Sequence, residues 1–329
     1  MLVYILRRLA LTLSVIVGAI TLTFVIFYLG PSDPVAALCP RNCTANQQAQ
    51  IERKMGLDQP RIQQYGQYMK GLVAGREIGS GPTAQSCDAP CLGWSFIQNR
   101  PVKDIVFQVL PVTLSILIGG AVVYVIFGLA FGVIAARNRG NYLDRFIVGV
   151  TQTVPAVPYY VLALLFYLYL MVLHPILPQA GYTSPFENPF AWITGFIGVW
   201  MLYGLYAATG YVRYVRANMI DALAGDYVRT ARSKGLSEWK VTISHALRAT
   251  MAPFLTLVGL NLVLDIGGAI FTENIFGLQG MGYLSIQSFN NSDLQVISGI
   301  VVVTAIVTSV GNLIVDLLYG VVDPRVKLS

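Results

Sequence analysis

The chain alternates between long apolar runs and shorter segments rich in charged residues. An apolar run of about 20 residues is long enough for one helix to cross the hydrocarbon core of a bilayer. Six runs reach that length with at most one charged residue inside, and they occupy residues 9–32, 105–136, 146–173, 188–212, 249–272 and 294–315. The pattern therefore predicts an all-α integral membrane protein with six transmembrane helices.

The composition agrees with this interpretation. Of the 329 residues, 55% are apolar and 12% are charged, whereas soluble domains carry about 25% charged residues. The net charge of +6 comes from basic residues that are spread between the runs, so it does not indicate a nucleic-acid-binding protein. The run 9–32 is followed by a long polar region without a small-residue cleavage site in the expected place, so we interpret it as a retained helix and not a signal peptide.

The distribution of arginine and lysine sets the expected orientation, because short cytoplasmic loops of membrane proteins are enriched in these residues. The loops 174–187 and 274–293 contain none, whereas the loops after the second and fourth runs contain several. Both termini are therefore expected in the cytoplasm. The chain then divides into an N-terminal transmembrane helix (1–32), an extracytoplasmic loop (33–104), a core of five helices that includes a cytoplasmic loop at 213–248 (105–320), and a cytoplasmic tail (321–329).

All four cysteines fall in the extracytoplasmic loop: Cys39, Cys43, Cys87 and Cys91. An even number on the oxidising side of the membrane favours disulfides. Three pairings are possible, and the sequence does not select one of them. A bridge between the two clusters would close a loop of about 50 residues and add roughly 4 kcal/mol in the chain-entropy description. A zinc site is the alternative, and it is disfavoured because no histidine lies nearby.

Local signals in the same loop predict two helices. Thr44 and Gln47 form a capping-box pattern that opens a helix ending at Gly56. Pro60 suits the first turn of a second helix that runs to about residue 72. Residues 75–90 are rich in Gly, Ser and Pro and are expected to be irregular. Such a loop could cover the outer mouth of a pore, receive an external partner, or form a surface cap without contacts.

Acidic residues in or beside the apolar runs are the candidates for chemistry, because a charge at mid-membrane costs at least ~3 kcal/mol on insertion scales. Asp265 is the only charged residue inside a run, and we expect it either to face an aqueous path or to be paired. Glu273 and Asp316 lie at run ends, where they are expected to reach the water among the lipid headgroups. Asp265 and Glu273 are the candidate pathway residues.

Two further patterns concern the shape of the helices. Pro155 and Pro158 in the third run predict a kink. The second run contains four small residues that favour the close approach of a neighbouring helix: Gly119, Gly120, Gly128 and Gly132.

Signatures of catalysis are missing from the sequence. It contains no phosphate-binding Gly-x4-Gly-Lys-Ser/Thr motif, no His-Glu-x-x-His and no Gly-x-Ser-x-Gly. The two histidines, His174 and His245, are too few and too far apart for a metal site. We therefore expect no enzyme activity and no cofactor or metal bound by this chain.

A charged, helix-prone segment at 226–240 separates the fourth and fifth runs. We expect one helix over roughly 218–233 and a left-handed turn at Gly235. A second helix, capped by Ser237, is expected to continue through Trp239, Ile243 and Leu247. A helix–glycine–helix unit beside the bilayer is a compact projection that a groove of a soluble protein can hold. The alternative is an amphipathic segment that only anchors the loop on anionic lipid.

The same segment resembles the EAA loop of binding-protein-dependent ABC importer permeases, in the form of the oligopeptide/dipeptide branch (B-type subunit). Gly235 matches the glycine of the motif, and Ala231 matches one of its alanines. Arg229 and Thr230 stand where the general consensus has Glu and Ala, and Arg248 replaces a later Pro. These departures are usual in the peptide branch.

The resemblance extends along most of the chain. Four more segments match in order: Tyr4–Leu9 with Thr23, Phe24 and Gly30–Pro34; Met55–Pro60 with Gln64, Tyr65, Gly79 and Ser80; Thr272–Phe276 with Gly280–Gly282; and Asp316–Tyr319 with Asp323–Arg325. Residues 35–50 and 81–99, which carry the cysteines, depart from the family pattern and look like additions.

The resemblance implies a type I ABC importer permease fold in the bacterial plasma (inner) membrane. It implies a homologous C-type permease as partner, two cytoplasmic ATPase subunits or domains that bind ATP and Mg²⁺, and an external substrate-binding protein that delivers di- or oligopeptides. The residues implied to contact the ATPases are Tyr227, Arg229, Thr230, Ala231, Arg232, Lys234, Gly235 and Leu236.

Other functions stay open at this point. Close relatives of peptide permeases carry nickel or glutathione, and the motifs discriminate poorly between these substrates. A proton- or sodium-coupled secondary transporter would use Asp265, but neither a relay nor inverted repeats are evident. A membrane-anchored structural or sensor protein would need far fewer than six spans.

Overall fold

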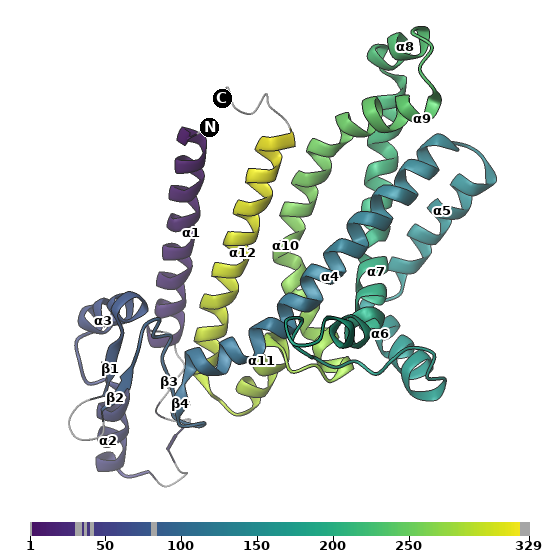
Figure 1. The fold of residues 1–329 in the computed structure, drawn as a ribbon. Helices are drawn as coiled ribbons and strands as arrows, with labels where there is room; N and C mark the ends of the chain where they lie inside the picture. The colour runs from purple at the N-terminus through teal and green to yellow at the C-terminus, as the bar shows by residue number, and fades with distance from the viewer. Residues whose placement is uncertain (1, 30–34, 36–37, 40–42, 80–83, 323–329) are drawn as a thin grey trace. The chain divides into compact units, whose positions relative to one another are not determined.

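The computed structural model describes residues 2–29, 35, 38–39, 43–79 and 84–322 (Figure 1). The motif segments 30–34 and 323–325 lie outside the described residues, and so does most of the expected cytoplasmic tail. The chain forms two compact units. One consists of Leu6–Pro111 with Gln279–Val310, and the other consists mainly of Val112–Leu278.

Helices long and apolar enough to cross a membrane number five among the described residues, or six if one bent pair is a single span. The single-helix candidates are Leu6–Phe27, Val102–Arg137, Pro189–Ala224, Glu238–Asn261 and Leu294–Leu317. They belong to α1 (Leu2–Leu29), α4 (Val102–Arg137), α7 (Pro189–Ala224), the helical stretch that enters α10 (Arg248–Phe276), and α12 (Leu294–Val322). The prediction of an all-α membrane protein is confirmed.

The bent pair occupies the third apolar run. It consists of α5 (Tyr142–Thr153) with η2 (Val154–Ala156), followed by α6 (Tyr159–Tyr167) with η3 (Leu168–Leu173), and the two halves meet at 95°. The break falls at Val157, whose backbone is extended with ψ 127°. A residue before proline is driven out of the helical region, so Pro158 explains the position of the break. The kink expected from the two prolines is therefore a complete interruption of the helix.

The glycines of α4 allow α7 to approach closely. A Cβ built on each of them would collide with an α7 side chain: Gly119 with Trp200, Gly120 with Tyr203, Gly128 with Tyr211, and Gly132 with Val215. Small residues at helix contacts in membranes give this kind of close packing. The structure thus assigns these glycines to packing.

The segment after α1 contains two helices and two short hairpins. The helices are α2 (Ala45–Met55) and α3 (Arg61–Ala74), and Figure 1 shows them near the C-terminal end of α1. The capping box at Thr44 and the left-handed Gly56 (φ 70°) are both present. Pro60 is the residue immediately before the first turn of α3. Both helix predictions are confirmed within two residues at their ends.

The expectation that residues 75–90 are irregular is wrong in part. β1 (Arg76–Ile78) pairs antiparallel with β2 (Gln85–Cys87), and β3 (Trp94–Ser95) pairs antiparallel with β4 (Arg100–Pro101). Turn-forming residues between two short strands produce a hairpin, and strands of two or three residues leave too little alternation to be recognised in a sequence.

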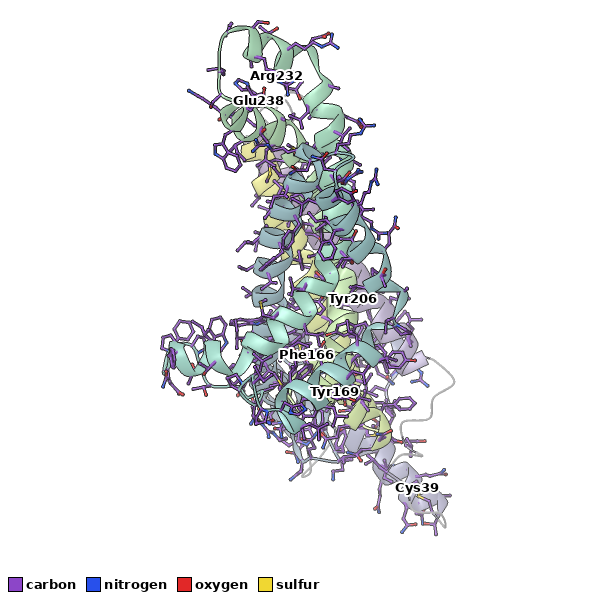
Figure 2. The ribbon with its side chains drawn as sticks, turned by 90° about the vertical axis from the view of Figure 1, so that its right-hand side faces the viewer. Cys39, Phe166, Tyr169, Tyr206, Arg232 and Glu238 are labelled. Carbon is purple, nitrogen blue, oxygen red and sulfur yellow. A yellow bond between two sulfur atoms is a disulfide. The ribbon has the colours of Figure 1, made fainter. Side chains whose placement is uncertain are left out.

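Each disulfide closes within its own cysteine cluster. Cys39 bonds to Cys43, which lies beside the start of α2, and Cys87 bonds to Cys91 (Figure 2). Cys87 and Cys91 are buried with Ile78 in a small apolar core. The prediction of disulfides is confirmed, and the zinc alternative is excluded because both pairs are oxidised.

The turn between α11 (Met281–Asn290) and α12 is fastened to the hairpin segment. The Ser95 hydroxyl donates to Oδ2 of Asp293 at 2.5 Å, and the Val296 N–H donates to the other carboxylate oxygen at 3.4 Å. Asp293 is buried. Burial raises the pKa of the Asp293 carboxyl, while its two hydrogen bonds act in the opposite direction.

Candidate functional site

Residues 226–240, here named the coupling segment, project from the end of α7 as two short helices joined by a turn. α7 ends at Ala224, and α8 (Asp226–Ser233) starts after Gly225, which is extended with ψ 149°. A Cβ at Gly225 would lie 2.6 Å from Cε1 of Tyr227, so a side chain at this junction between α7 and α8 would collide with the tyrosine ring. The single helix expected over 218–233 is therefore wrong, because Gly225 divides it.

A Schellman motif ends α8. Gly235 has φ 76°, its N–H donates to the Arg232 carbonyl at 2.9 Å, and the Leu236 N–H donates to the Ala231 carbonyl at 3.4 Å. This pair of bonds satisfies the last carbonyls of a helix and requires a left-handed residue at the glycine position. A Cβ at Gly235 would meet nothing within 4 Å, so backbone conformation alone favours glycine there. The left-handed turn predicted at Gly235 is confirmed.

The second arm of the coupling segment is continuous with a transmembrane helix. The Ser237 hydroxyl accepts from the Lys240 N–H at 3.4 Å and caps α9 (Glu238–Lys240). The chain then winds through the wider turns of η4 (Val241–Leu247) into α10 without leaving the helical region. The cap is confirmed, and the helix continues through Leu247 as expected and on into α10. The Gly235 turn is thus connected to α10 through one continuous helical backbone.

The inner side of the coupling segment is apolar. Val228 and Ala231 are buried and belong to one core cluster with Val241 and Ala246, and Leu236 packs partly buried against it. Two residues of the predicted contact set, Ala231 and Leu236, therefore hold the segment to the helices behind it. Val228 was missed by the sequence reasoning, although its spacing of three from Ala231 is the signal of a buried helix face.

The outer side of the coupling segment is polar and basic. Tyr227 is 47% exposed, and the other predicted contact residues on this side are also exposed: Arg229, Thr230, Arg232, Lys234 and Gly235. Across the turn, Arg232 donates to both carboxylate oxygens of Glu238, at 2.8 and 3.2 Å (Figure 2). Glu238 was not among the predicted residues, because a separation of six is not a helical pairing distance.

The intramembrane carboxylate Asp265 is held by two tyrosines from other helices. Tyr203 of α7 donates to Oδ1 at 2.7 Å, and Tyr124 of α4 donates to Oδ2 at 3.0 Å. The Tyr124 ring stacks on Tyr211, with centroids 4.7 Å apart, and Asn261 donates to the Tyr211 hydroxyl at 3.1 Å. Asp265 itself keeps partial exposure. The carboxylate is therefore paired with hydroxyl donors and held in one orientation.

Glu273 does not reach headgroup water as expected. Its side chain is fully buried, and the Thr113 hydroxyl donates to its Oε1 at 2.6 Å. The end of α10 at Phe276 and the left-handed Gly277 place Glu273 in the last turn of the helix, where its carboxyl accepts this hydrogen bond from α4. Asp316 is half-buried in α12. The structure does not bring Glu273 and Asp265 together.

Two family descriptions match the chain. The family described as "Binding-protein-dependent transport system inner membrane component" matches residues 128–328, which include the coupling segment and Asp265. The family described as the N-terminal part of a binding-protein-dependent transport system membrane component matches residues 1–117. Together the two matches cover nearly the whole chain.

Curated relatives align over the same length. A protein of Brucella abortus (strain 2308) that is named a putative peptide transport system permease is 31% identical over 323 residues, with 98% of both chains covered. The dipeptide transport system permease protein DppB of Escherichia coli (strain K12) is 31% identical, with 99% of both chains covered. A probable peptide ABC transporter permease of Sinorhizobium fredii is 29% identical over 325 residues. The chain therefore belongs to the family of inner membrane components of binding-protein-dependent transport systems.

Proposed function

We propose that this chain is the translocation subunit of an ATP-driven importer that carries di- or oligopeptides into the cytoplasm. Peptide as the substrate class is supported by the names of relatives that align over their full length. In this proposal a second, homologous permease completes the pathway. Two ATPase subunits or domains bind ATP with Mg²⁺ and hydrolyse it, and an external binding protein delivers the peptide, so this chain performs no catalysis.

The observation that carries the proposal is the construction of the coupling segment. Its basic face is exposed, its turn is fixed by the Schellman motif at Gly235, and its second arm runs into α10. A soluble motor that grips the exposed face can move α10 directly. Alternating access needs such a link, because closure of the ATPases must bias the permease between outward-open and inward-open arrangements.

We propose Asp265 as a residue of the translocation path. Both of its oxygens accept hydrogen bonds from tyrosines of two other helices, so any movement of α10 relative to α4 or α7 must change this contact. Partial exposure leaves the carboxylate available to a polar cargo. Glu273, which is fully buried, is not part of this proposal.

The test is transport by the purified assembly in proteoliposomes. The chain is isolated from its native membrane by affinity tag, co-purifying proteins are identified by mass spectrometry, and uptake of labelled peptide is measured with and without ATP and binding protein. The proposal requires a second permease, a Walker-motif ATPase, and peptide uptake that depends on ATP. Gradient-driven uptake by this chain alone, or ATP-dependent uptake of nickel or glutathione but not peptide, would refute it.

A further inference from the structure

A groove of about 500 Å³ separates the last turns of α4 from η4. Apolar side chains form its walls, among them Leu129 and Val133 on α4 and Ile243 and Leu247 on the η4 side. Only one end is polar, where Arg137, the last residue of α4, meets Trp239 of α9. The groove is thus an apolar channel with a cation at its mouth.

The length of the groove matches one leaflet of a bilayer. Its α4 wall runs from Val125 to Arg137, which at 1.5 Å per residue is about 18 Å. Half of the hydrocarbon core of a bilayer is about 15 Å thick. Arg137 and Arg139 lie in a loop assigned to the cytoplasm by its positive charge. The groove therefore spans the cytoplasmic leaflet, and its polar end lies at the headgroup level.

The polar end is arranged to receive an anion. The Arg137 guanidinium lies over the Trp239 ring, 5.4 Å from its centroid. A guanidinium next to an aromatic ring still has N–H groups that can donate to the oxygens of a phosphate. The neighbouring acidic group, Glu238, is engaged by Arg232 through both carboxylate oxygens. Tryptophan is also a residue typical of the membrane interface.

We propose that this groove is a binding site for one anionic phospholipid of the cytoplasmic leaflet, with an acyl chain along α4 and η4 and the phosphate at Arg137. The apolar walls and the single cation at one end match the two parts of such a lipid.

The site has a consequence for coupling. Trp239 and Ile243 belong to the second arm, through which the coupling segment is continuous with α10. A lipid bound between this arm and α4 should stabilise the conformation of the structure, in which the groove separates α4 from η4. Stimulation of ATP hydrolysis by the binding protein should accordingly depend on anionic lipid more than basal hydrolysis does.

The test uses the assembled importer in nanodiscs of phosphatidylcholine with increasing phosphatidylglycerol, and native mass spectrometry to count retained phosphatidylglycerol. Arg137→Gln should weaken retention about fivefold, from ~1 kcal/mol per basic residue near a membrane surface. Ala130→Trp, which fills the groove from an exposed position on its wall, should abolish retention. The matched controls are Arg139→Gln and Val122→Trp, which alter exposed positions outside the groove.

A photoreactive benzoyl-phenylalanine at Ile243 in the otherwise unchanged importer gives an independent measurement. We expect an adduct whose added mass is that of phosphatidylglycerol. An adduct with another polypeptide at this position, equal retention of phosphatidylcholine and phosphatidylglycerol, or equal losses in Arg137→Gln and Arg139→Gln would each overturn the assignment.

Discussion

Replacing Gly235 tests whether the backbone of one turn carries force between the ATPases and the membrane. The residue has φ 76° and nothing would touch a Cβ within 4 Å, so Gly235→Ala adds backbone strain and no steric clash. A left-handed conformation costs an L-residue about 1–2 kcal/mol. The native turn should therefore lose at least about fivefold in population relative to open forms. Gly235→Asn should reduce the population of the native turn less than Gly235→Ala does, because asparagine adopts the left-handed region more readily.

Proline at the same position is the extreme case. Its ring fixes φ near −65°, and it removes the N–H that donates to the Arg232 carbonyl. We expect Gly235→Pro to abolish ATP-dependent uptake while the chain still inserts in the membrane. Peptide uptake is expected to decrease in the order Gly, Asn, Ala, Pro for the residue at position 235. Uptake and binding-protein-stimulated ATPase activity are measured in proteoliposomes, with assembly checked by size-exclusion chromatography.

Gly140 provides the matched control for these variants. It also has positive φ, 85°, and open space around a Cβ, but it lies in the turn between α4 and α5. Gly140→Ala should carry the same backbone strain without uncoupling transport from ATP hydrolysis. Normal uptake by a well-inserted Gly235→Pro variant, or equal loss of coupling in the two alanine variants, would refute the reasoning.

Further predictions concern the polar contacts and the helix packing. Asp265→Asn removes the carboxylate but keeps an oxygen that can accept from a tyrosine hydroxyl. Peptide uptake should fall while the complex still assembles. Unchanged uptake would show that Asp265 is not part of the translocation path. The Arg232–Glu238 pair is exposed, so a double-mutant cycle of unfolding free energies should give only a weak coupling that decreases with salt. A coupling that persists in high salt would contradict this assignment. The folded-state pKa of Asp293 is raised, so its favourable contribution to stability is present below the unfolded pKa of about 3.9 and is lost as pH rises through the folded pKa. The Tm of Asp293→Asn relative to the unchanged protein should therefore increase as the pH is raised from about 4, and a pH-independent difference would contradict the raised pKa. Gly132→Leu places a branched side chain against α7 and should destabilise the protein by about 1–3 kcal/mol or more, measured as a lower Tm or loss of the assembled complex, whereas an unchanged Tm would exclude the close packing.

Sequence patterns predicted the features that depend on local chemistry. The apolar runs, the capping box at Thr44, the glycine turn at Gly235 and the Ser237 cap all follow from backbone preferences that a few neighbouring residues determine, and the structure has each of them. The break at Pro158 was expected only as a kink, because proline marks the position of a break and tertiary packing sets its angle.

Features that depend on distant contacts were not predictable. Asp265, Tyr124 and Tyr203 lie on three different helices, and no spacing in the sequence indicates that the carboxylate accepts hydrogen bonds from these two tyrosines. Glu273 is buried and accepts a hydrogen bond from a threonine of α4, whereas its position at a run end indicated the opposite environment. The sequence did not identify the disulfide partners, because pairing depends on how the loop folds. In the structure each cysteine bonds within its own cluster.

Site-specific photocrosslinking from the coupling segment tests the central claim most directly. Tyr227 is 47% exposed on α8, and Tyr182, 39% exposed in the loop between η3 and α7, is a tyrosine on the opposite side of the membrane by the assigned orientation. Each is replaced by benzoyl-phenylalanine in the intact importer, and adducts are identified by mass spectrometry. We expect an adduct between position 227 and a Walker-motif ATPase, in a yield that changes with ATP, and none from position 182. An intact complex that gives no ATPase adduct from position 227, or equal adducts from both positions, would contradict it.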